Sequence, residues 1–375
     1  MVLAEMTPPS AADKSYDYIG RDFREVATPA LILDIKQAEA NIDLMALRVR
    51  EYGRGLRPHA KAHKSPELAK RQMLSGAVGI TVATVSEAIA MAEAGLSQIL
   101  IANQVVGEAK SRGLVRAARH SSVIVAADDE GNLRALSRVA TAAAVRIGVL
   151  IELDLGMGRA GARSSEEALA LARIADELPG IDLRGLQGYE GHCMHEPDPD
   201  LRETKIKLAI DKLGDVSAQL GKAGLPCDVV TAGGTGSYAV TGRDARVSDI
   251  QPGTYVLMDV FHRGFVTDFP PAVSILTTVV SSHADTFVAD FGRKSVATEF
   301  CMAEVAASGQ RPRYLAEEHA LFDCGGDDRP SVGDVLQVIP GYGPSTVSLH
   351  RSYYVVRDEV IVDVWPIVGT NPLFA

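Results

Sequence analysis

Short apolar runs alternate with longer helix-like stretches from residue 29 to residue 234. The short runs are rich in β-branched residues, whereas the stretches between them are rich in Ala, Leu and Glu. Strands that alternate with helices form parallel sheets. The pattern predicts eight strands, at residues 29–35, 56–62, 79–85, 98–103, 122–128, 145–153, 183–191 and 228–234.

Eight strand–helix units of this length are typical of a closed (β/α)8 TIM barrel. The alternative is an open, doubly wound sheet, in which the turn after the first strand carries a GxGxxG signature. No such signature follows residues 29–35. We therefore predict an α/β fold with a barrel.

The alternation ends near residue 260, and strand-like runs joined by turns follow. These runs are "PAVSILTTVVSSHADTFVADFG", "DVLQVIPG" and "SYYVVRDEVIVDVWPIV", and they predict a mainly β domain. We divide the chain into an N-terminal arm (1–24) that is partly disordered or joins the β domain, a barrel (25–260) and a β domain (261–375). No long linker separates the last two parts, so we expect them to pack together.

Composition limits the classes of partner. The chain has 375 residues and a net charge of −10, which disfavours a nucleic acid or an anionic membrane as partner. No apolar run has transmembrane length, and the first twenty residues lack the basic start and apolar core of a secretory signal. The four cysteines form no CxxC pair, so we expect reduced thiols and a cytoplasmic protein.

A basic segment, "LRPHAKAHKSPE" (56–67), lies at the end of the second predicted strand, where barrels place their active sites. An inward-facing Lys61 among like charges has a lowered pKa, which suits a lysine that forms a Schiff base. The alternative is a solvated basic loop. The basic or titratable residues of this segment are Arg57, His59, Lys61, His63 and Lys64.

A glycine-rich segment, "GGTGS" (233–237), follows the last predicted strand. Its backbone amides can approach an anion closely, and the hydroxyls of Thr235 and Ser237 add donors. Barrels often bind phosphate after their last strands, although a simple tight turn is the alternative. Together with Lys61, this segment predicts a cofactor that bears both a phosphate and an aldehyde.

Other predicted strand ends contribute polar residues, namely Asp154, Arg159, Tyr189, His192 and His195. The string "GHCMH" (191–195) contains two histidines and a cysteine, which are common zinc ligands. No CxxC pair occurs elsewhere in the sequence to complete a zinc site, so we interpret the string as lining a polar site. Glu87 is predicted to cap a helix.

Several segments occur in the order and spacing of one enzyme family: "TPALILDI", "RPHAKAHKS", "TVATVSEA", "ILIANQVV", "DLGMGRAG", "GGTGSY", "IQPGTY", "EEHA" and "VWPI". From about residue 24 onward the chain resembles the D-threonine aldolase, D-serine dehydratase and 3-hydroxy-D-aspartate aldolase family. These are fold-type III pyridoxal phosphate enzymes, distant relatives of alanine racemase. The resemblance implies an alanine racemase-type barrel, pyridoxal 5'-phosphate, a D-configured amino-acid substrate, and a homodimer in which one subunit's β domain helps to close the other's site.

The resemblance also implies roles for individual residues. Lys61 would hold the cofactor as a Schiff base, Arg159 would lie near its phenolic oxygen, and Gln251 would face its pyridine nitrogen. Tyr189 would flank the ring. The full set of expected cofactor-binding residues is Lys61, His59, Arg159, Tyr189, Gly233, Gly234, Thr235, Gly236, Ser237 and Gln251.

One family feature is missing from this sequence. The family holds a divalent metal with a PxHxC or PxHxD string near the C-terminus, and the corresponding string here is "PGYGPSTVSL" (340–349). Tyr342 replaces the histidine, and Gly343 or Pro344 replaces the second ligand. Glycine and proline supply no side-chain ligand, and a neutral phenol is a poor one. We therefore predict that the usual metal site is absent.

These observations leave three functions open. The first is a metal-independent lyase, an aldolase or a dehydratase, acting on a β-hydroxy D-amino acid. The second is a racemase or epimerase that uses Lys61 and a second base such as Tyr342 or His319. The third is a cofactor-binding protein without activity, which the large β domain disfavours. The expected catalytic residues are Lys61, His63, Tyr189, His192, His319 and Tyr342, with His350 as a further candidate base.

Overall fold

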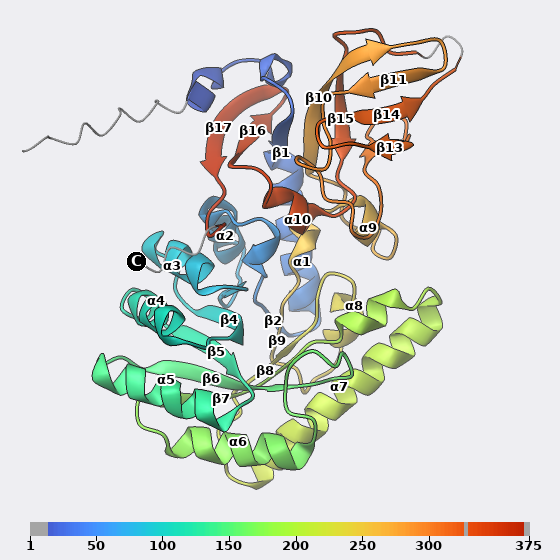
Figure 1. Cartoon of the computed structure of the whole chain (residues 1–375). Coiled ribbons are helices and arrows are strands. Elements are labelled where there is room, and N and C mark those ends of the chain that lie inside the picture. The colour runs from blue at the N-terminus through green and yellow to red at the C-terminus, as the bar shows by residue number, and fades with distance from the viewer. Residues whose placement is uncertain (1–13, 326–328, 371–375) are drawn as a thin grey trace, which may run out of the picture.

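The protein consists of a parallel α/β barrel and a mainly β domain (Figure 1). The computed structural model describes residues 14–325 and 329–370. Most of the predicted N-terminal arm, residues 1–13, lies outside this range. The next residues form two 3-10 turns, η1 (Lys14–Tyr18) and η2 (Phe23–Glu25). Phe23 packs into an apolar cluster of the β domain with Val356 and Ile361.

Eight parallel strands form the barrel sheet, in the order β2-β9-β8-β7-β6-β5-β4-β3. A parallel bridge between His59 and Thr81 connects the two ends of this order. The predicted barrel with a mainly β second domain is therefore confirmed. The strands are β2 (Gly55–Leu56), β3 (Ile80–Val82), β4 (Ile99–Gln104), β5 (Val123–Ala127), β6 (Ile147–Leu153), β7 (Ile181–Gly188), β8 (Val229–Ala232) and β9 (Asp249–Ile250).

Seven longer helices accompany the barrel strands, and polar side chains cap the first turns of all of them except α4, whose N-cap residue is Gly107. Ser65 and Thr84, for example, accept backbone N–H bonds at the starts of α2 and α3. Glu87 accepts from Ala83 N at 2.8 Å, so it caps α3 as predicted. The helices are α1 (Ile35–Glu51), α2 (Pro66–Leu74), α3 (Val85–Glu93), α4 (Glu108–Ala118), α5 (Glu130–Ala142), α6 (Ser165–Glu177) and α7 (Pro199–Lys222).

The β domain contains a sheet in the order β13-β14-β11-β10-β1-β16-β17, with β15 also paired to β10 and β12 to β15. Its strands are β1 (Ala30–Asp34), β10 (Val273–Ser282), β11 (Thr286–Ala289), β12 (Glu304–Val305), β13 (Tyr314–Leu315), β14 (Ala320–Asp323), β15 (Val335–Ile339), β16 (Ser352–Arg357) and β17 (Val360–Pro366). The described fold also contains three one-turn α-helices: α8 (Tyr238–Thr241), α9 (Val260–Arg263) and α10 (Gly343–Val347).

The first predicted strand belongs to the β domain rather than to the barrel. Residues 29–35 do contain a strand, β1, but it pairs with β10 and β16. Figure 1 shows this blue strand among the orange and red strands of the C-terminal half. The eighth barrel strand is instead β9, which sequence analysis did not count. The β domain is therefore built from both ends of the chain.

The second predicted strand is much shorter than expected. Only Gly55–Leu56 is strand, and residues 60–62 form a 3-10 turn, η3 (Ala60–Ala62). Pro58 has no N–H for a ladder hydrogen bond, which limits the strand at this point. Lys61 consequently lies on the turn beyond the strand. This turn packs against α10, which connects the barrel mouth with the β domain (Figure 1).

One hydrophobic cluster runs through both parts of the molecule. It joins barrel residues such as Leu68 and Ile250 to β-domain residues such as Phe322 and Tyr353. The two parts thus pack together, as expected from the lack of a linker. Within residues 14–325 and 329–370, no helix combines the length and the apolar character needed to cross a membrane.

Candidate functional site

A cavity of about 250 Å³ opens where the barrel strands end. Nine of the predicted site residues line it: His59, Lys61, Arg159, Tyr189, Gly233, Gly234, Thr235, Gln251 and Tyr342. The cavity also contains polar residues that sequence analysis did not identify, namely Asn103, Gln187, Thr254 and His262. The predicted lysine and glycine-rich segment therefore face one common space.

Lys61 reaches the cavity from η3. Its side chain is accessible to water there, but the surrounding protein lowers its pKa, and the nearby positive charge of Arg159 lowers it further. Glu87 acts in the opposite direction. A lysine whose pKa is lowered has more of the unprotonated amine, which is the nucleophilic form.

The glycine-rich segment presents backbone N–H groups. Gly233 N donates to the buried carboxylate of Glu190 at 3.2 Å, and Gly234 N donates to Ser237 Oγ at 3.0 Å. Among the hydrogen bonds of the described residues, none uses the N–H groups of Thr235 or Gly236. Two adjacent amides without a protein partner suit a bound anion.

Arg159 and Tyr189 form one wall. The guanidinium lies 5.7 Å from the centre of the Tyr189 ring, and its Nη2 lies 3.6 Å from Glu152 Oε1. Burial, followed by the charge of Glu190, raises the pKa of Tyr189 to about 12. Tyr189 therefore stays a neutral phenol near pH 7.

Two buried polar atoms of the cavity wall have no partner within the described residues. His59 Nδ1 and Gln187 Oε1 make no hydrogen bond within the described structure. Burial and the charge of Lys61 hold the pKa of His59 well below its usual range. Gln251 donates to Thr231 Oγ1 at 3.0 Å. Buried polar atoms are normally hydrogen-bonded, so the unpaired ones fit a wall that contacts a polar ligand.

His63 lies away from the cavity. It is fully buried, Ser65 N donates to its Nδ1 at 3.1 Å, and its Nε2 lies 3.2 Å from Gln72 Oε1. Burial lowers the pKa of His63 to about 4. Because both ring nitrogens have protein partners, the structure gives His63 a packing position and no access to a substrate.

The other four predicted residues also do not line the cavity. His192 lies on η4 (Gly191–His195), with its ring 3.6 Å from Cys193 Sγ. His319 is exposed on the turn between β13 and β14. Ser237 closes the glycine-rich segment by accepting from Gly234 N. A Cβ on Gly236 would lie 2.2 Å from Met194 Sδ, so this glycine allows Met194 to pack closely against the segment.

A histidine that sequence analysis missed lies at the cavity wall beside Tyr342. His262 belongs to α9, and its Nδ1 lies 2.8 Å from Asp259 Oδ1. The Tyr342 and His262 rings stack, with centroids 5.6 Å apart. The missed sequence signal was Asp-x-x-His immediately after the barrel. The residues are separated by one helical turn, which places both on one face.

The position of the family's metal string offers no ligand set. Tyr342 lies beside Gly343 and Pro344, and burial, Tyr189 and Asp259 raise the pKa of Tyr342 to about 12. A neutral phenol is a weak ligand for a divalent ion. The described ranges contain no group of three or more His, Cys, Asp or Glu residues arranged to hold a metal ion. The residues at this position therefore do not fit the family's metal.

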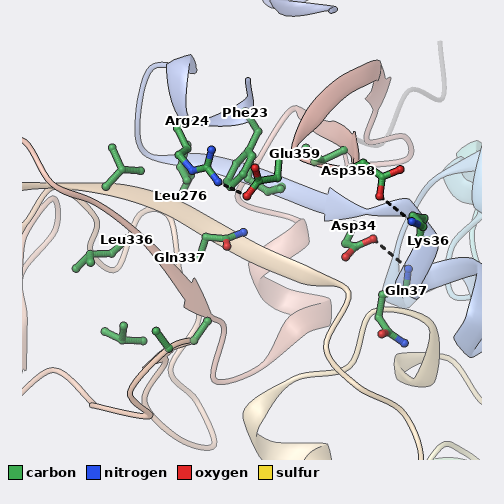
Figure 2. Close-up of a pocket in the computed structure, with 16 residues that line it drawn as sticks. Phe23, Arg24, Asp34, Lys36, Gln37, Leu276, Leu336, Gln337, Asp358 and Glu359 are labelled. Atoms are coloured by element: carbon green, nitrogen blue, oxygen red, sulfur yellow. Dashed lines mark hydrogen bonds and ion pairs between the residues drawn. The ribbon is translucent and has the colours of Figure 1, made fainter. Parts of the chain in front are cut away.

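A larger cavity, of about 650 Å³, lies on the β domain (Figure 2). Its charged side chains already have partners: Arg24 pairs with Glu359, and Lys36 pairs with Asp358 at 2.7 Å. It contains neither Lys61 nor the glycine-rich segment. We therefore take the smaller cavity as the candidate active site.

Comparison with known proteins places these features in a family. The alanine racemase N-terminal domain matches residues 33–260, and a serine dehydratase domain matches residues 272–356. The D-threonine aldolase of Arthrobacter sp. is 36% identical over 356 residues, which cover 93% of this chain and 94% of that protein. The 3-hydroxy-D-aspartate aldolase of Paracoccus denitrificans (strain Pd 1222) is 32% identical over 93% of both chains.

A solved structure gives the same result. The crystal structure of D-threonine aldolase from Filomicrobium marinum superposes with a TM-score of 0.90, at 32% identity, over 93% of this chain and 97% of that one. The chain therefore belongs to the alanine racemase-like family that contains the D-threonine aldolases and the 3-hydroxy-D-aspartate aldolases, as the sequence resemblance implied.

Proposed function

We propose that this chain is a pyridoxal 5'-phosphate-dependent lyase that cleaves a β-hydroxy D-amino acid as an aldolase, without a divalent metal. One observation carries the proposal: Lys61 lines one cavity with Gly233, Gly234 and Thr235 of the glycine-rich segment, in a chain that matches two aldolases over 93% of its length. Pyridoxal phosphate supplies an electron sink for a bond broken at the substrate's Cα.

The cavity residues fit this cofactor at three points. The amides of Thr235 and Gly236 would hold its phosphate, and Lys61 would bind its aldehyde carbon. Tyr189 and Arg159 would flank it on one side, and Gln251 would face its ring nitrogen. The unpaired nitrogen of His59 would find a polar partner in the filled site. With these assignments, His63, His192 and His319 do not transfer protons in the active site of their own chain.

The cavity wall beside Tyr342 suits cleavage of the substrate's Cα–Cβ bond better than loss of its β-hydroxyl group. Dehydration needs a proton donor or Lewis acid on the β-oxygen, whereas aldol cleavage needs a base there. The wall beside Tyr342 offers an imidazole bound to a carboxylate, which favours proton removal. For this reason we place the aldolase before the dehydratase.

The function is tested with the purified holoenzyme and a panel of D- and L-amino acids, with and without β-hydroxyls. An aldolase releases glycine and an aldehyde, or glyoxylate from 3-hydroxyaspartate. A dehydratase releases ammonia and a keto acid, and a racemase exchanges the Cα proton with inversion. Aldehyde release from D-isomers alone is the expected result, and either of the other product patterns would contradict the proposal.

Gly234→Leu is expected to weaken cofactor affinity at least about tenfold, the equivalent of one lost charge-assisted hydrogen bond. A Cβ at this position already lies 3.3 Å from the Tyr189 ring, so a larger side chain would occupy the cavity. The dissociation constant is measured by titrating apoprotein with pyridoxal phosphate. Gly221→Leu is the matched control, because a Cβ at Gly221 meets nothing within 4 Å. Equal affinities in the two variants would remove this segment from the site.

Chelation is expected to leave kcat unchanged, because Tyr342, Gly343 and Pro344 supply no charged ligand. The holoenzyme is treated with EDTA, freed of chelator and assayed with the best substrate of the panel. Metal content is measured in the same samples. Activity that disappears and returns with Mn²⁺, Zn²⁺ or Mg²⁺ would reveal a metal site built from other residues.

Two further features complete the proposal. We expect a homodimer, in which the β domain of one copy borders the cavity of the other, and light scattering of the holoenzyme tests this. We also expect the enzyme to work in the cytoplasm. All four cysteines lie in the described ranges and are free, which agrees with a reducing compartment.

A further inference from the structure

The Asp259–His262 pair lies where the β domain meets the barrel mouth. Asp259 is fully buried, and its carboxylate caps α9 by accepting from His262 N at 2.8 Å. The same carboxylate lies 2.8 and 3.0 Å from His262 Nδ1 and accepts from Gly343 N at 2.8 Å. Both carboxylate oxygens are thus occupied, and the imidazole ring is held in one orientation.

This contact determines which ring nitrogen of His262 carries a proton. An ionised carboxylate can only accept hydrogen bonds, so Nδ1 must be the protonated nitrogen. In the neutral ring, Nε2 then has a free lone pair. Within the described residues no hydrogen bond uses Nε2, and His262 lines the cavity that contains Lys61. The pair therefore presents a basic nitrogen to the candidate active site.

The other ionisable side chains of the cavity are less suited to act as a base. Tyr189 and Tyr342 have a pKa raised to about 12, and Arg159 remains a cation. Burial and the charge of Lys61 depress the pKa of His59, so it binds a proton weakly. Lys61 itself is assigned to the cofactor.

We propose that His262 is the general base that removes the proton from the substrate's β-hydroxyl, and that Asp259 is the residue that positions it. This inference rests on the proposed aldolase function and names the group that performs its proton transfer. Tyr342, stacked on His262, is placed to donate a hydrogen bond to the same hydroxyl oxygen.

The step balances without a metal. Nε2 takes the hydroxyl proton, the electron pair of the O–H bond forms the carbonyl of the released aldehyde, and the Cα–Cβ bond breaks. The electron pair of that bond stays with Cα, which later takes up one proton to give glycine. In total, one proton moves from oxygen to carbon, and no oxidant or reductant is needed.

The test compares wild-type holoenzyme with His262→Gln. The substrate is the β-hydroxy D-amino acid that wild type cleaves fastest among D-threonine, D-allothreonine, D-phenylserine and 3-hydroxy-D-aspartate. Loss of a general base lowers kcat by about 10²–10⁴-fold. Exchange of glycine's Cα proton in D2O involves no hydroxyl, so His262→Gln should leave its rate and the cofactor content unchanged.

Asp259 and a control histidine need their own measurements. Asp259→Asn should move the proton of His262 from Nδ1 to Nε2, which ¹⁵N NMR of the apoprotein detects, and should lower kcat. His283→Gln is the matched control, because His283 Nε2 lies 3.2 Å from Ser281 Oγ and His283 does not line the cavity. Its kcat should equal that of wild type.

The outcomes separate this inference from the proposed function. If wild type cleaves a β-hydroxy D-amino acid and His262→Gln cleaves it equally fast, His262 is not the base, although the aldolase function stands. A fall in glycine exchange equal to the fall in cleavage would also overturn the assignment, because His262 would then act at Cα or support the fold. If wild type cleaves none of the four substrates, both the proposed function and this inference fail.

Discussion

Replacing Lys61 with alanine is expected to remove covalent cofactor attachment and to lower kcat/KM by at least about 10⁴-fold, the size of loss found when a nucleophile is deleted from a catalytic unit. Lys61 is the lysine that lines the cavity in the described structure, and its pKa is lowered by the surrounding protein and by the positive charge of Arg159. Alanine supplies no amine, whereas the amides of Thr235 and Gly236 remain. The variant should therefore still bind the cofactor, but without a covalent bond.

Borohydride reduction followed by peptide mass spectrometry measures this attachment directly. In wild type the pyridoxyl label should appear on the peptide that contains Lys61, and in Lys61→Ala no peptide should carry it. Lys64→Met is the matched control, because Lys64 is paired with the buried Glu87 and does not face the cavity. A label that persists in Lys61→Ala and disappears in Lys64→Met would show that Lys64, and not Lys61, carries the cofactor.

The elements of the barrel were predictable because their signals are local. Runs such as residues 98–103 and 122–128 are strands with almost the predicted bounds, β4 and β5. Their β-branched composition and the Ala-rich helices between them need no knowledge of distant residues. The glycine-rich segment was found for a similar reason, since its chemistry is contained in five consecutive residues.

The sheet to which a strand belongs is a non-local property. Residues 29–35 look like a buried parallel strand, and β1 is indeed buried over most of its length. Its partners β10 and β16 come from residues 273–282 and 352–357, which no local pattern indicates. The true eighth strand, β9, contains two residues, too few for any periodicity to be visible.

The five basic or titratable residues of the segment 56–67 do not all face the same site. Arg57 pairs with Asp249, His63 is buried against Gln72, and Lys64 pairs with Glu87. Only His59 and Lys61 of the five reach the cavity. A tight turn sends successive side chains in different directions, so closeness in sequence did not mean a common target. Conversely, His262 and Tyr342 stack on each other at the cavity although they are eighty residues apart in the sequence.

Arg57→Met is expected to lower the free energy of unfolding by about 3–5 kcal/mol, the usual cost of leaving one member of a buried ion pair uncompensated. Arg57 Nη2 lies 3.1 Å from Asp249 Oδ2, and both side chains are at most 6% exposed. Nε of Arg57 makes a second bond to the same oxygen at 3.3 Å. Methionine would leave the Asp249 carboxylate buried at β9 with neither bond. Urea unfolding followed by circular dichroism gives the change.

Two comparisons isolate the buried charge as the cause. Arg134→Met removes an exposed ion pair to Glu130, with 2.8 Å between the charged atoms, and should cost at most about 1 kcal/mol. Adding Asp249→Leu to Arg57→Met removes the stranded carboxylate, so the double variant should regain most of the lost stability. Neither Arg57 nor Asp249 lines the cavity, so cofactor affinity should stay the same. If the double variant is as unstable as the single one, lost packing of the Arg57 alkyl chain, rather than the unpaired charge, accounts for the effect.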